Sequence, residues 1–269
     1  MTQVHFDSDF RSDMQMILNR RTLLLGGAGL VLAGCNVWPF TQAEANVTGQ
    51  TADGSACIKL PGEMVGPFPA DGTNRIAGET VNVLDKLGVI REDIRNSFDG
   101  LTDVAGGVPL ALNLKLVNVS NACMPLRDHV IYIWQCDAAG QYSLYERKTA
   151  NYLRGAAVTD ADGIAKITTV FPGCYPGRWP HLHVEIFASK ETAVKGSASL
   201  LTSQFAFKKK DCDAVYTSHP AYAASPANLA KLSLTGDMIF ANNTAEQLAA
   251  QTLAIVDGSA SATIGIATA

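Results

Sequence analysis

The sequence predicts an all-β protein with a two-sheet β-sandwich core and long loops, preceded by an export signal and a tether. Gly-Pro, Asp-Gly and Pro-Gly pairs recur between residues 66 and 173, and the apolar runs between them are short. Those runs are rich in β-branched and aromatic residues, which favour strands over helices. Short strands separated by frequent turns are typical of a sandwich of two packed sheets.

Strict alternation predicts the first core strand. Leu110, Leu112, Leu114 and Leu116 alternate with small or polar residues, as expected for a strand with one buried face. Four further strands are predicted from apolar, β-branched or aromatic runs, at residues 130–134, 164–171, 181–187 and 200–207.

The remaining segments are less distinctive. Residues 80–98 are predicted as either helix or loop, residues 245–256 as either a short helix or a strand, and residues 262–267 as an edge strand. The like charges at residues 208–210 are interpreted as a solvated turn.

Residues 1–35 are predicted to be an export signal rather than part of the folded domain. Arg20 and Arg21 precede an apolar stretch that is too short to span a bilayer, a pattern typical of twin-arginine export signals. The stretch ends in a Leu-Ala-Gly-Cys sequence at Cys35, which looks like a lipobox whose cysteine is acylated. Cleavage after Ala45 to release a soluble protein is the alternative.

The export signal implies a location for the protein and a boundary for its folded domain. Residues 36–56 are small and polar and predict a flexible tether, so the folded domain is expected at residues 57–269. The protein is therefore expected to be periplasmic or extracytoplasmic, and to touch a membrane only through a lipid on Cys35. The twin-arginine route carries proteins already folded, which suits a cofactor inserted in the cytoplasm.

Composition argues against a nucleic-acid-binding protein. The chain has 269 residues and a formal net charge of -4, whereas phosphate binding needs a dense basic patch. Its 6 cysteines include no CxxC pair, so a cysteine-based zinc site is not expected. Acylation of Cys35 would leave an odd number, and hence at least one free thiol or an intermolecular bond. Spacing alone does not give the disulfide pairing.

The segment from Phe171 to His183 carries the chemistry. Side chains two residues apart in a strand point to the same face, so His181 and His183 can offer two imidazoles to one metal ion. The loop before them is rich in proline and glycine and can fold Tyr175 and Arg178 back over the same point.

The remaining ligands decide which metal is expected. Glu185 lies on the same face of a regular strand, so His181, His183 and Glu185 would suit Fe(II), Zn or Mn. The phenolates of Tyr142 and Tyr175, in contrast, are hard anionic donors that favour a trivalent ion. Both tyrosines lie in or just after predicted turns.

Three motifs resemble, in order and spacing, the intradiol ring-cleavage dioxygenases, the family of protocatechuate 3,4-dioxygenase and catechol 1,2-dioxygenase. They are residues 134–143, 153–163 and 171–183, and Gly66-Pro67-Phe68 resembles the family's Gly-Pro-Tyr segment. The resemblance covers residues 57–207 and implies a β-sandwich core. Phe68 and the Trp179-Pro180 pair depart from the family pattern.

The resemblance also implies roles for individual residues. Tyr142, Tyr175, His181 and His183 would be the protein ligands of a five-coordinate non-haem Fe(III) completed by hydroxide. Tyr175 would also take a proton from the substrate, Arg178 would stabilise negative charge on the ring, and Gln204 would steady the site.

The implied reaction uses O₂ to cleave a catechol-type ring between its two hydroxyl-bearing carbons, giving a cis,cis-muconate-type diacid. The partners would be a small aromatic diol and O₂, and the protein is free to form oligomers. The alternatives are a His-His-Glu metalloenzyme and a non-catalytic, lipid-tethered binding module.

Side chains around the four ligands are expected to be structural. Asp137 would cap its turn, Cys174 would be packed or disulfide-bonded, and Trp134 and Trp179 would line the core and the cleft. Arg154 would either line the cleft or brace a loop.

Overall fold

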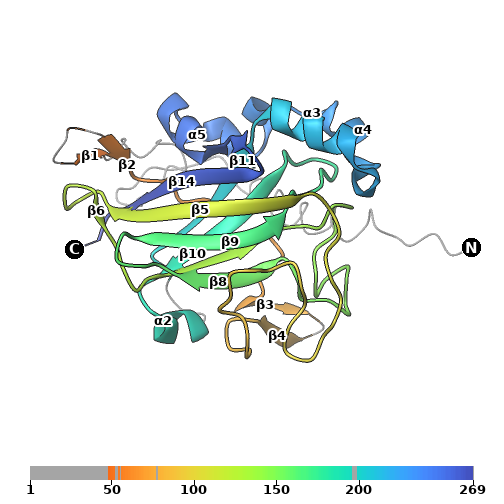
Figure 1. Ribbon diagram of the computed structural model, residues 1–269, viewed down its shortest axis with the longest axis horizontal. Coiled ribbons are helices and arrows are strands. Elements are labelled where there is room, and N and C mark those ends of the chain that lie inside the picture. The colour runs from red at the N-terminus through yellow and green to blue at the C-terminus, as the bar shows by residue number, and fades with distance from the viewer. Residues whose placement is uncertain (1–47, 52–53, 55, 77, 196–198, 269) are drawn as a thin grey trace, which may run out of the picture. The chain divides into compact units, whose positions relative to one another are not determined.

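Two five-stranded β-sheets form the core of the domain in this computed structural model (Figure 1). The structure describes residues 48–51, 54, 56–76, 78–195 and 199–268. The predicted signal, the lipobox and residues 36–47 of the predicted tether lie outside the described residues. No helix of the described part is long and apolar enough to cross a membrane.

The first sheet contains three of the predicted strands, those at residues 130–134, 181–187 and 200–207. Its order is β12 (Thr252–Leu253), β11 (Leu201–Phe207), β10 (His181–Phe187), β7 (Val130–Trp134) and β8 (Arg154–Val158). The central strand β10 is buried along its whole length. Apolar residues of β10 alternate with His181, His183 and Glu185, and these three polar side chains are buried as well.

The second sheet is built around the alternating strand. Its order is β13 (Ile255–Val256), β14 (Ser259–Ile266), β5 (Pro109–Asn118) and β6 (Met124–Pro125), and β9 (Ile164–Val170) also pairs with β5. Two small hairpin-like sheets complete the β-structure of the described residues, β1 (Thr48–Gln50) with β2 (Ala56–Ile58) and β3 (Asp71–Ile76) with β4 (Glu79–Asn82).

The inward faces of the two sheets share one hydrophobic core. The leucines of β5 meet apolar side chains of β7 and β10 there, and the main contributors are Leu110, Leu112, Leu114, Leu116, Ile131, Ile133, Leu182, Val184 and Ile186. Burial of one such side chain contributes about 1.5–3 kcal/mol, so this layer is the main source of the domain's stability. The mostly-β, two-sheet prediction is confirmed.

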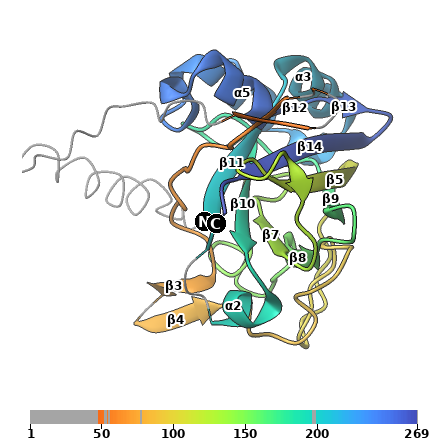
Figure 2. The same cartoon turned by 90° about the vertical axis from the view of Figure 1, so that its left-hand side faces the viewer.

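One short helix precedes β11 and the other helices of the described residues follow it. They are α2 (Lys190–Val194), α3 (Lys209–Ser218), α4 (Ser225–Leu229) and α5 (Ala245–Gln251), with 3₁₀ turns at Pro220–Tyr222, Leu234–Gly236 and Phe240–Asn242. Figures 1 and 2 place α3 and α5 near one end of β10 and α2 near the other.

Several open predictions are resolved by local chemistry. The 245–256 stretch becomes α5 followed by β12 and β13, because Thr244 and Gln247 form a reciprocal capping box at the start of the helix. Residues 80–98 are loop beyond β4, and Ile90 and Asp93 bridge to β8 and β9. The predicted last strand is longer, and it is not an edge strand, because β14 lies between β13 and β5 and pairs in parallel with β5.

The interpretation of the three lysines as a turn is wrong. Lys208 is the N-cap residue of α3, and Lys209 and Lys210 begin the helix, where all three remain exposed. Lys209 is held by Asp213 one turn later, with an Nζ to Oδ2 distance of 2.8 Å. Pairs of this spacing stabilise a helix and offset the unfavourable position of a cation in its first turn.

A disulfide ties the start of the domain to the second sheet. Cys57 of β2 is bonded to Cys123 in the turn after β5, and the two are 66 residues apart. Residues 48–50, expected within the 36–56 tether, pair with β2 and so form part of the folded domain. Three other cysteines, Cys136, Cys174 and Cys212, are free and buried.

Candidate metal centre

The two histidines lie on the outward face of the first sheet. Because neighbouring residues of a strand point to opposite faces, the inward position of Leu182 and Val184 turns His181 and His183 away from the sandwich core. The register sets His183 between Trp134 of β7 and Gln204 of β11. The Trp134 indole stacks on the His183 imidazole with ring centroids 4.6 Å apart, which fixes the plane of the ring.

A tight turn after β7 positions Tyr142. Asp137 Oδ1 accepts hydrogen bonds from the backbone N–H groups of Ala139 (2.9 Å) and Gln141 (3.0 Å). The side chain thus caps the turn, as predicted, and the fully folded turn places Tyr142 over the sheet. Only 2% of Tyr142 is exposed.

Tyr175 comes from the loop that joins β9 to β10. This loop packs against the Tyr142 turn at Gly140, where a Cβ atom would lie 3.1 Å from Tyr175 Cβ. The φ of +82° at Gly140 is also one that side chains disfavour. Glycine there lets the two ligand-bearing loops approach each other closely.

The structure brings the four predicted ligand atoms together. The Tyr142 hydroxyl is 3.3 Å from His183 Nε2 and 3.4 Å from His181 Nε2. The Tyr175 hydroxyl is 3.2 Å from His181 Nε2. Adjacent ligands with bonds of about 2.1 Å to one ion lie roughly 3 Å apart, so these separations fit donors that converge on a single metal.

Both histidines are held neutral, and His181 directs a lone pair at the other donors. His181 Nδ1 donates a 2.6 Å hydrogen bond to the Trp179 carbonyl, which leaves Nε2 as the unprotonated nitrogen. Burial, and then the charge of Arg178, lowers the pKa of His181 to about 3. Burial and the neighbouring His181 hold the pKa of His183 well below its usual range.

The phenols require a strong cation to ionise. Burial raises the pKa of both Tyr142 and Tyr175, so neither is a phenolate by itself at neutral pH. An ion that binds them must displace two protons, which favours a highly charged metal. Two phenol and two neutral imidazole donors at this spacing therefore fit a metal ion, and the phenols favour a highly charged one.

Arg178 and Gln204 flank this cluster. The Arg178 guanidinium places NH1 3.5 Å from His181 Nε2 and donates from NH2 to Gln204 Oε1 at 2.7 Å. Gln204 in turn donates from Nε2 to the Met64 carbonyl at 2.9 Å. Arg178 also forms a buried ion pair with Asp237, a residue that lies beyond the sequence motifs and was not predicted.

The segment before β3 covers the cluster. Gly66 lies against His183, because a Cβ at Gly66 would be 3.2 Å from His183 Cε1. The Phe68 ring packs 4.9 Å from Tyr142 and 4.8 Å from Tyr145. Phe68 therefore forms an apolar wall beside the predicted ligands.

The brace alternative for Arg154 is confirmed. Its side chain is fully buried and donates to the carbonyls of Phe68, Pro69 and Ser143 and to Ser143 Oγ. It thus joins the covering segment to the loop that carries Tyr142. Cys174 is a packed free thiol, one of the two outcomes expected for it.

The competing His-His-Glu site is not formed. Glu185 lies on the same face of β10, but its carboxylate accepts from Thr202 Oγ1 at 2.9 Å. Burial and the neighbouring Asp71 raise the pKa of Glu185 to about 8. Within the described part of the chain, no group of three or more His, Cys, Asp or Glu side chains is arranged to hold a metal.

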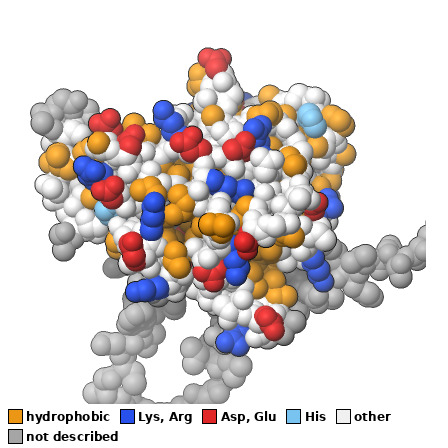
Figure 3. All heavy atoms as spheres, turned by 60° about the horizontal axis from the view of Figure 1, so that its bottom comes forward, with side chains coloured by type: hydrophobic (Ala, Val, Ile, Leu, Met, Phe, Trp, Pro, Cys, Tyr) orange, Lys and Arg blue, Asp and Glu red, His pale blue; other side chains and the backbone are white. Residues whose placement is uncertain are grey.

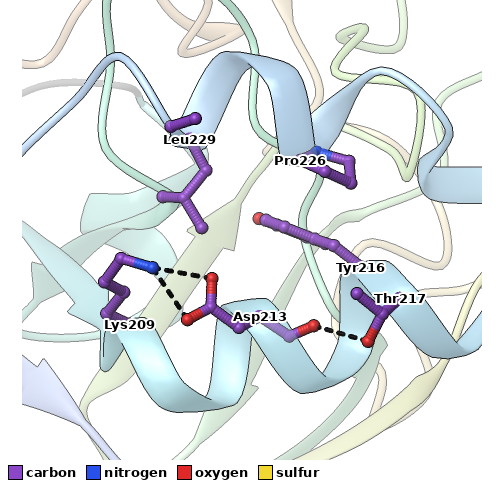
Figure 4. A pocket seen from close by; sticks show the side chains of 7 residues that line it. Lys209, Asp213, Tyr216, Thr217, Pro226 and Leu229 are labelled. Carbon is purple, nitrogen blue, oxygen red and sulfur yellow. Dashed lines mark hydrogen bonds and ion pairs between the residues drawn. The ribbon is translucent and has the colours of Figure 1, made fainter.

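A separate pocket lies between α3 and α4 (Figure 4). Its volume is about 100 Å³, and its lining residues, such as Tyr216 and Leu229, include none of the four predicted ligands. On the face shown in Figure 3, basic and acidic side chains are mixed, with hydrophobic ones between them.

The fold and this cluster agree with a family of oxygenases. A family model described as "Dioxygenase" matches residues 88–256, so the chain belongs to that family. Within it, the chain is an enzyme of the intradiol ring-cleavage class. No curated protein matches the chain significantly.

Solved structures resemble the chain to different degrees, all at low sequence identity. An intradiol ring-cleavage dioxygenase from Tetranychus urticae is 22% identical, with a TM-score of 0.59 over 78% of this chain and 95% of its own. The dioxygenase domain of a dioxygenase and carbohydrate-binding protein fusion from Streptomyces sp. SirexAA-E is 23% identical, with a TM-score of 0.45 over 78% of this chain and 97% of its own. A 3-chlorocatechol 1,2-dioxygenase from Rhodococcus opacus 1CP is 20% identical, with a TM-score of 0.47 over 84% and 75%.

Proposed function

We propose that this protein is a non-haem Fe(III) dioxygenase that cleaves a catechol-type ring between its two hydroxyl-bearing carbons, giving a cis,cis-muconate-type diacid. The observation that carries the proposal is the convergence of Tyr142, Tyr175, His181 and His183, with hydroxyl-to-Nε2 separations of 3.2–3.4 Å. A ferric ion held by these side chains would supply a Lewis-acidic centre for the diol oxygens and make the ring reactive towards dioxygen.

The chain's own groups have separate tasks. A diol that binds through both oxygens must lose two protons, and the Tyr175 oxygen accepts one of them. Tyr175 suits this task because it is the less buried of the two tyrosines and its loop reaches the surface at Pro176 and Gly177. Tyr142 is enclosed under Phe68 and remains in place.

Arg178 is the group that stabilises negative charge on the substrate. The Arg178 NH1 group faces the cluster and stabilises negative charge that develops on the ring. The Phe68 wall excludes water and packs against the flat face of an aromatic diol.

Colour and oxygen uptake test the proposal. The iron-loaded protein should show the reddish tyrosinate-to-iron charge-transfer band, and it should consume O₂ with at least one of catechol, protocatechuate and hydroxyquinol. A colourless preparation that binds stoichiometric zinc, or a red one that consumes no O₂ with any diol, would refute it.

We also infer export by the twin-arginine route with a lipid on Cys35. Support comes from the Arg20-Arg21 pair, the lipobox sequence and the Cys57–Cys123 disulfide, because disulfides persist in oxidising compartments. Mass spectrometry of the mature protein should find a diacylglyceryl group on Cys35, and Cys35→Ser should release the protein from membranes. A soluble mature chain that begins after Ala45 contradicts the lipid anchor.

A further inference from the structure

The loop from β9 to β10 is held by the helical region that follows β11. Four of its backbone groups bond to side chains of that region: Phe171 O to Tyr222 OH (2.8 Å), Pro172 O to Tyr216 OH (2.9 Å), Cys174 N to Ser225 Oγ (2.9 Å) and Cys174 O to Asn228 Nδ2 (2.7 Å). Buried backbone groups need such partners. The helical region therefore determines where the Tyr175 and Arg178 loop lies.

Asp237 extends this support to the arginine itself. Its Oδ2 accepts from Arg178 Nε at 3.0 Å and from the Trp179 backbone N–H at 2.8 Å. Its Oδ1 accepts from the Ile239 N–H at 2.9 Å and lies 3.4 Å from Arg178 NH2. Asp237 is 3% exposed and Arg178 7%, so the pair is shielded from water and salt.

The guanidinium is held along one edge only. Asp237 takes Nε and NH2, and Gln204 also takes NH2, whereas NH1 is the nitrogen that points to His181 Nε2. A guanidinium has its donors in a rigid plane, so fixing the Nε and NH2 edge fixes the direction of NH1. Asp237 thus aims Arg178 without touching the four-ligand cluster.

The charge balance supports the same role. A buried arginine without a partner is costly, and the Asp237 carboxylate neutralises it. Although burial alone would raise the pKa of Asp237, Arg178 and the backbone donors hold that pKa below its usual range. The pair is therefore ionised at neutral pH.

We propose that Asp237 is a positioning residue for ring cleavage, which holds Arg178 so that its NH1 group faces the reacting ring. This role rests on the proposed function, because it assumes that Arg178 stabilises charge on a bound diol. It adds a residue outside the sequence motifs to the machinery of the site.

The test is a double-mutant cycle on the iron-loaded, full domain. The variants are Asp237→Asn, Arg178→Ala and the double variant, and the matched control is Asp213→Asn, an exposed carboxylate of the same helical region that pairs with Lys209. Oxygen uptake gives kcat and KM, the visible band reports iron and the tyrosinates, and thermal unfolding reports folding.

A misdirected guanidinium should lower kcat of Asp237→Asn by about 10- to 100-fold, because misplacement of about 1 Å costs about that much. The visible band should persist, and Asp213→Asn should match the parent. Asp237→Asn should have no further effect on rate in the Arg178→Ala background. The proposal is overturned if kcat of Asp237→Asn lies within twofold of the parent value. It is also overturned if Asp237→Asn lowers kcat equally in the parent and in the Arg178→Ala background.

The cycle remains decisive if Asp237→Asn does not fold. The comparison of Arg178→Ala with the double variant is then sufficient. Equal residual rates and an equal or higher unfolding midpoint in the double variant support positioning through Arg178. A lower rate or a lower midpoint in the double variant refutes the positioning role. Failure of the proposed function is distinguishable, because it appears as absent oxygen uptake in the iron-loaded parent before any variant is compared.

Discussion

A Cβ atom added at Gly66 should disturb the metal centre in a way that backbone strain alone does not. Gly66 has a φ of +79°, and its added Cβ would lie 3.2 Å from His183 Cε1. Carbon atoms in ordinary contact are about 3.5–4.0 Å apart, so Gly66→Ala must move the imidazole or the covering segment by about 0.3 Å or more.

Gly100 provides the matched control. It has a similar φ of +86°, but an added Cβ would meet nothing within 4 Å. Both alanine variants should lose about 1–2 kcal/mol from the left-handed backbone conformation, which lowers the midpoint of thermal unfolding by about 2–8 °C in a domain of this size.

Only Gly66→Ala should change the site. Because misplacement of about 1 Å costs about 100-fold in rate, a shift of a few tenths of an ångström should lower kcat by about fivefold to tenfold. The visible band should shift as well, since His183 is one of the four proposed ligands. Oxygen uptake, absorption spectra and calorimetry measure these effects. The reasoning fails if Gly66→Ala keeps the parent spectrum and rate, or if Gly100→Ala changes them equally.

Three other predictions test different parts of the structure. Tyr175→Phe should shift the visible band and lower kcat by about 100-fold or more, because the proposed ligand and proton acceptor is lost, and unchanged oxygen uptake would show that Tyr175 has neither role. Replacing Cys57 and Cys123 with serine should cost about 4 kcal/mol in a denaturant titration, from the release of a 66-residue loop; a loss under 1 kcal/mol would contradict this. Arg154→Met should cost about 3 kcal/mol, since buried carbonyls lose their donor, while Arg127→Met, which removes an exposed pair, should cost less than about 1 kcal/mol. Equal losses in both arginine variants would refute the bracing role.

The strands of the core were predictable because their signals are local. The leucines of β5 alternate with other residues, the β7 run is apolar or aromatic throughout, and in β10 apolar residues alternate with His181, His183 and Glu185. The same-face position of His181 and His183 follows from the period of a strand, which tertiary packing does not alter.

The helical region after β11 was not predictable in the same way. The sequence of α3 is polar and begins with lysines, and only Cys212 and Tyr216 of it are buried. Only Cys212, Val215 and Tyr216 of this helix contact the hydrophobic core, which is too short an apolar stripe to mark a helix among polar residues. Asp237 could not be predicted from the sequence either, because its partner Arg178 lies 59 residues earlier in the chain.

The competing Glu185 site shows the limit of periodicity. A regular strand does place Glu185 on the face of His183, as expected. Its carboxyl group bonds to Thr202 instead, a neighbour supplied by the register with β11. Which side chains of one face act together depends on the adjacent strand, and the sequence of β10 does not contain that information.

The Cys57–Cys123 bond also determines how mechanical load would pass through the domain. A pull on the chain before residue 57, as from an anchored tether, first opens the short β1–β2 pairing and then reaches Cys57. The disulfide transfers that force directly to Cys123, beside the central strand β5. The covering segment with Gly66 and Phe68 lies inside the loop that the disulfide closes, so the force would not pass through it. Tension on the tether would therefore leave the covering segment in place over the predicted ligands.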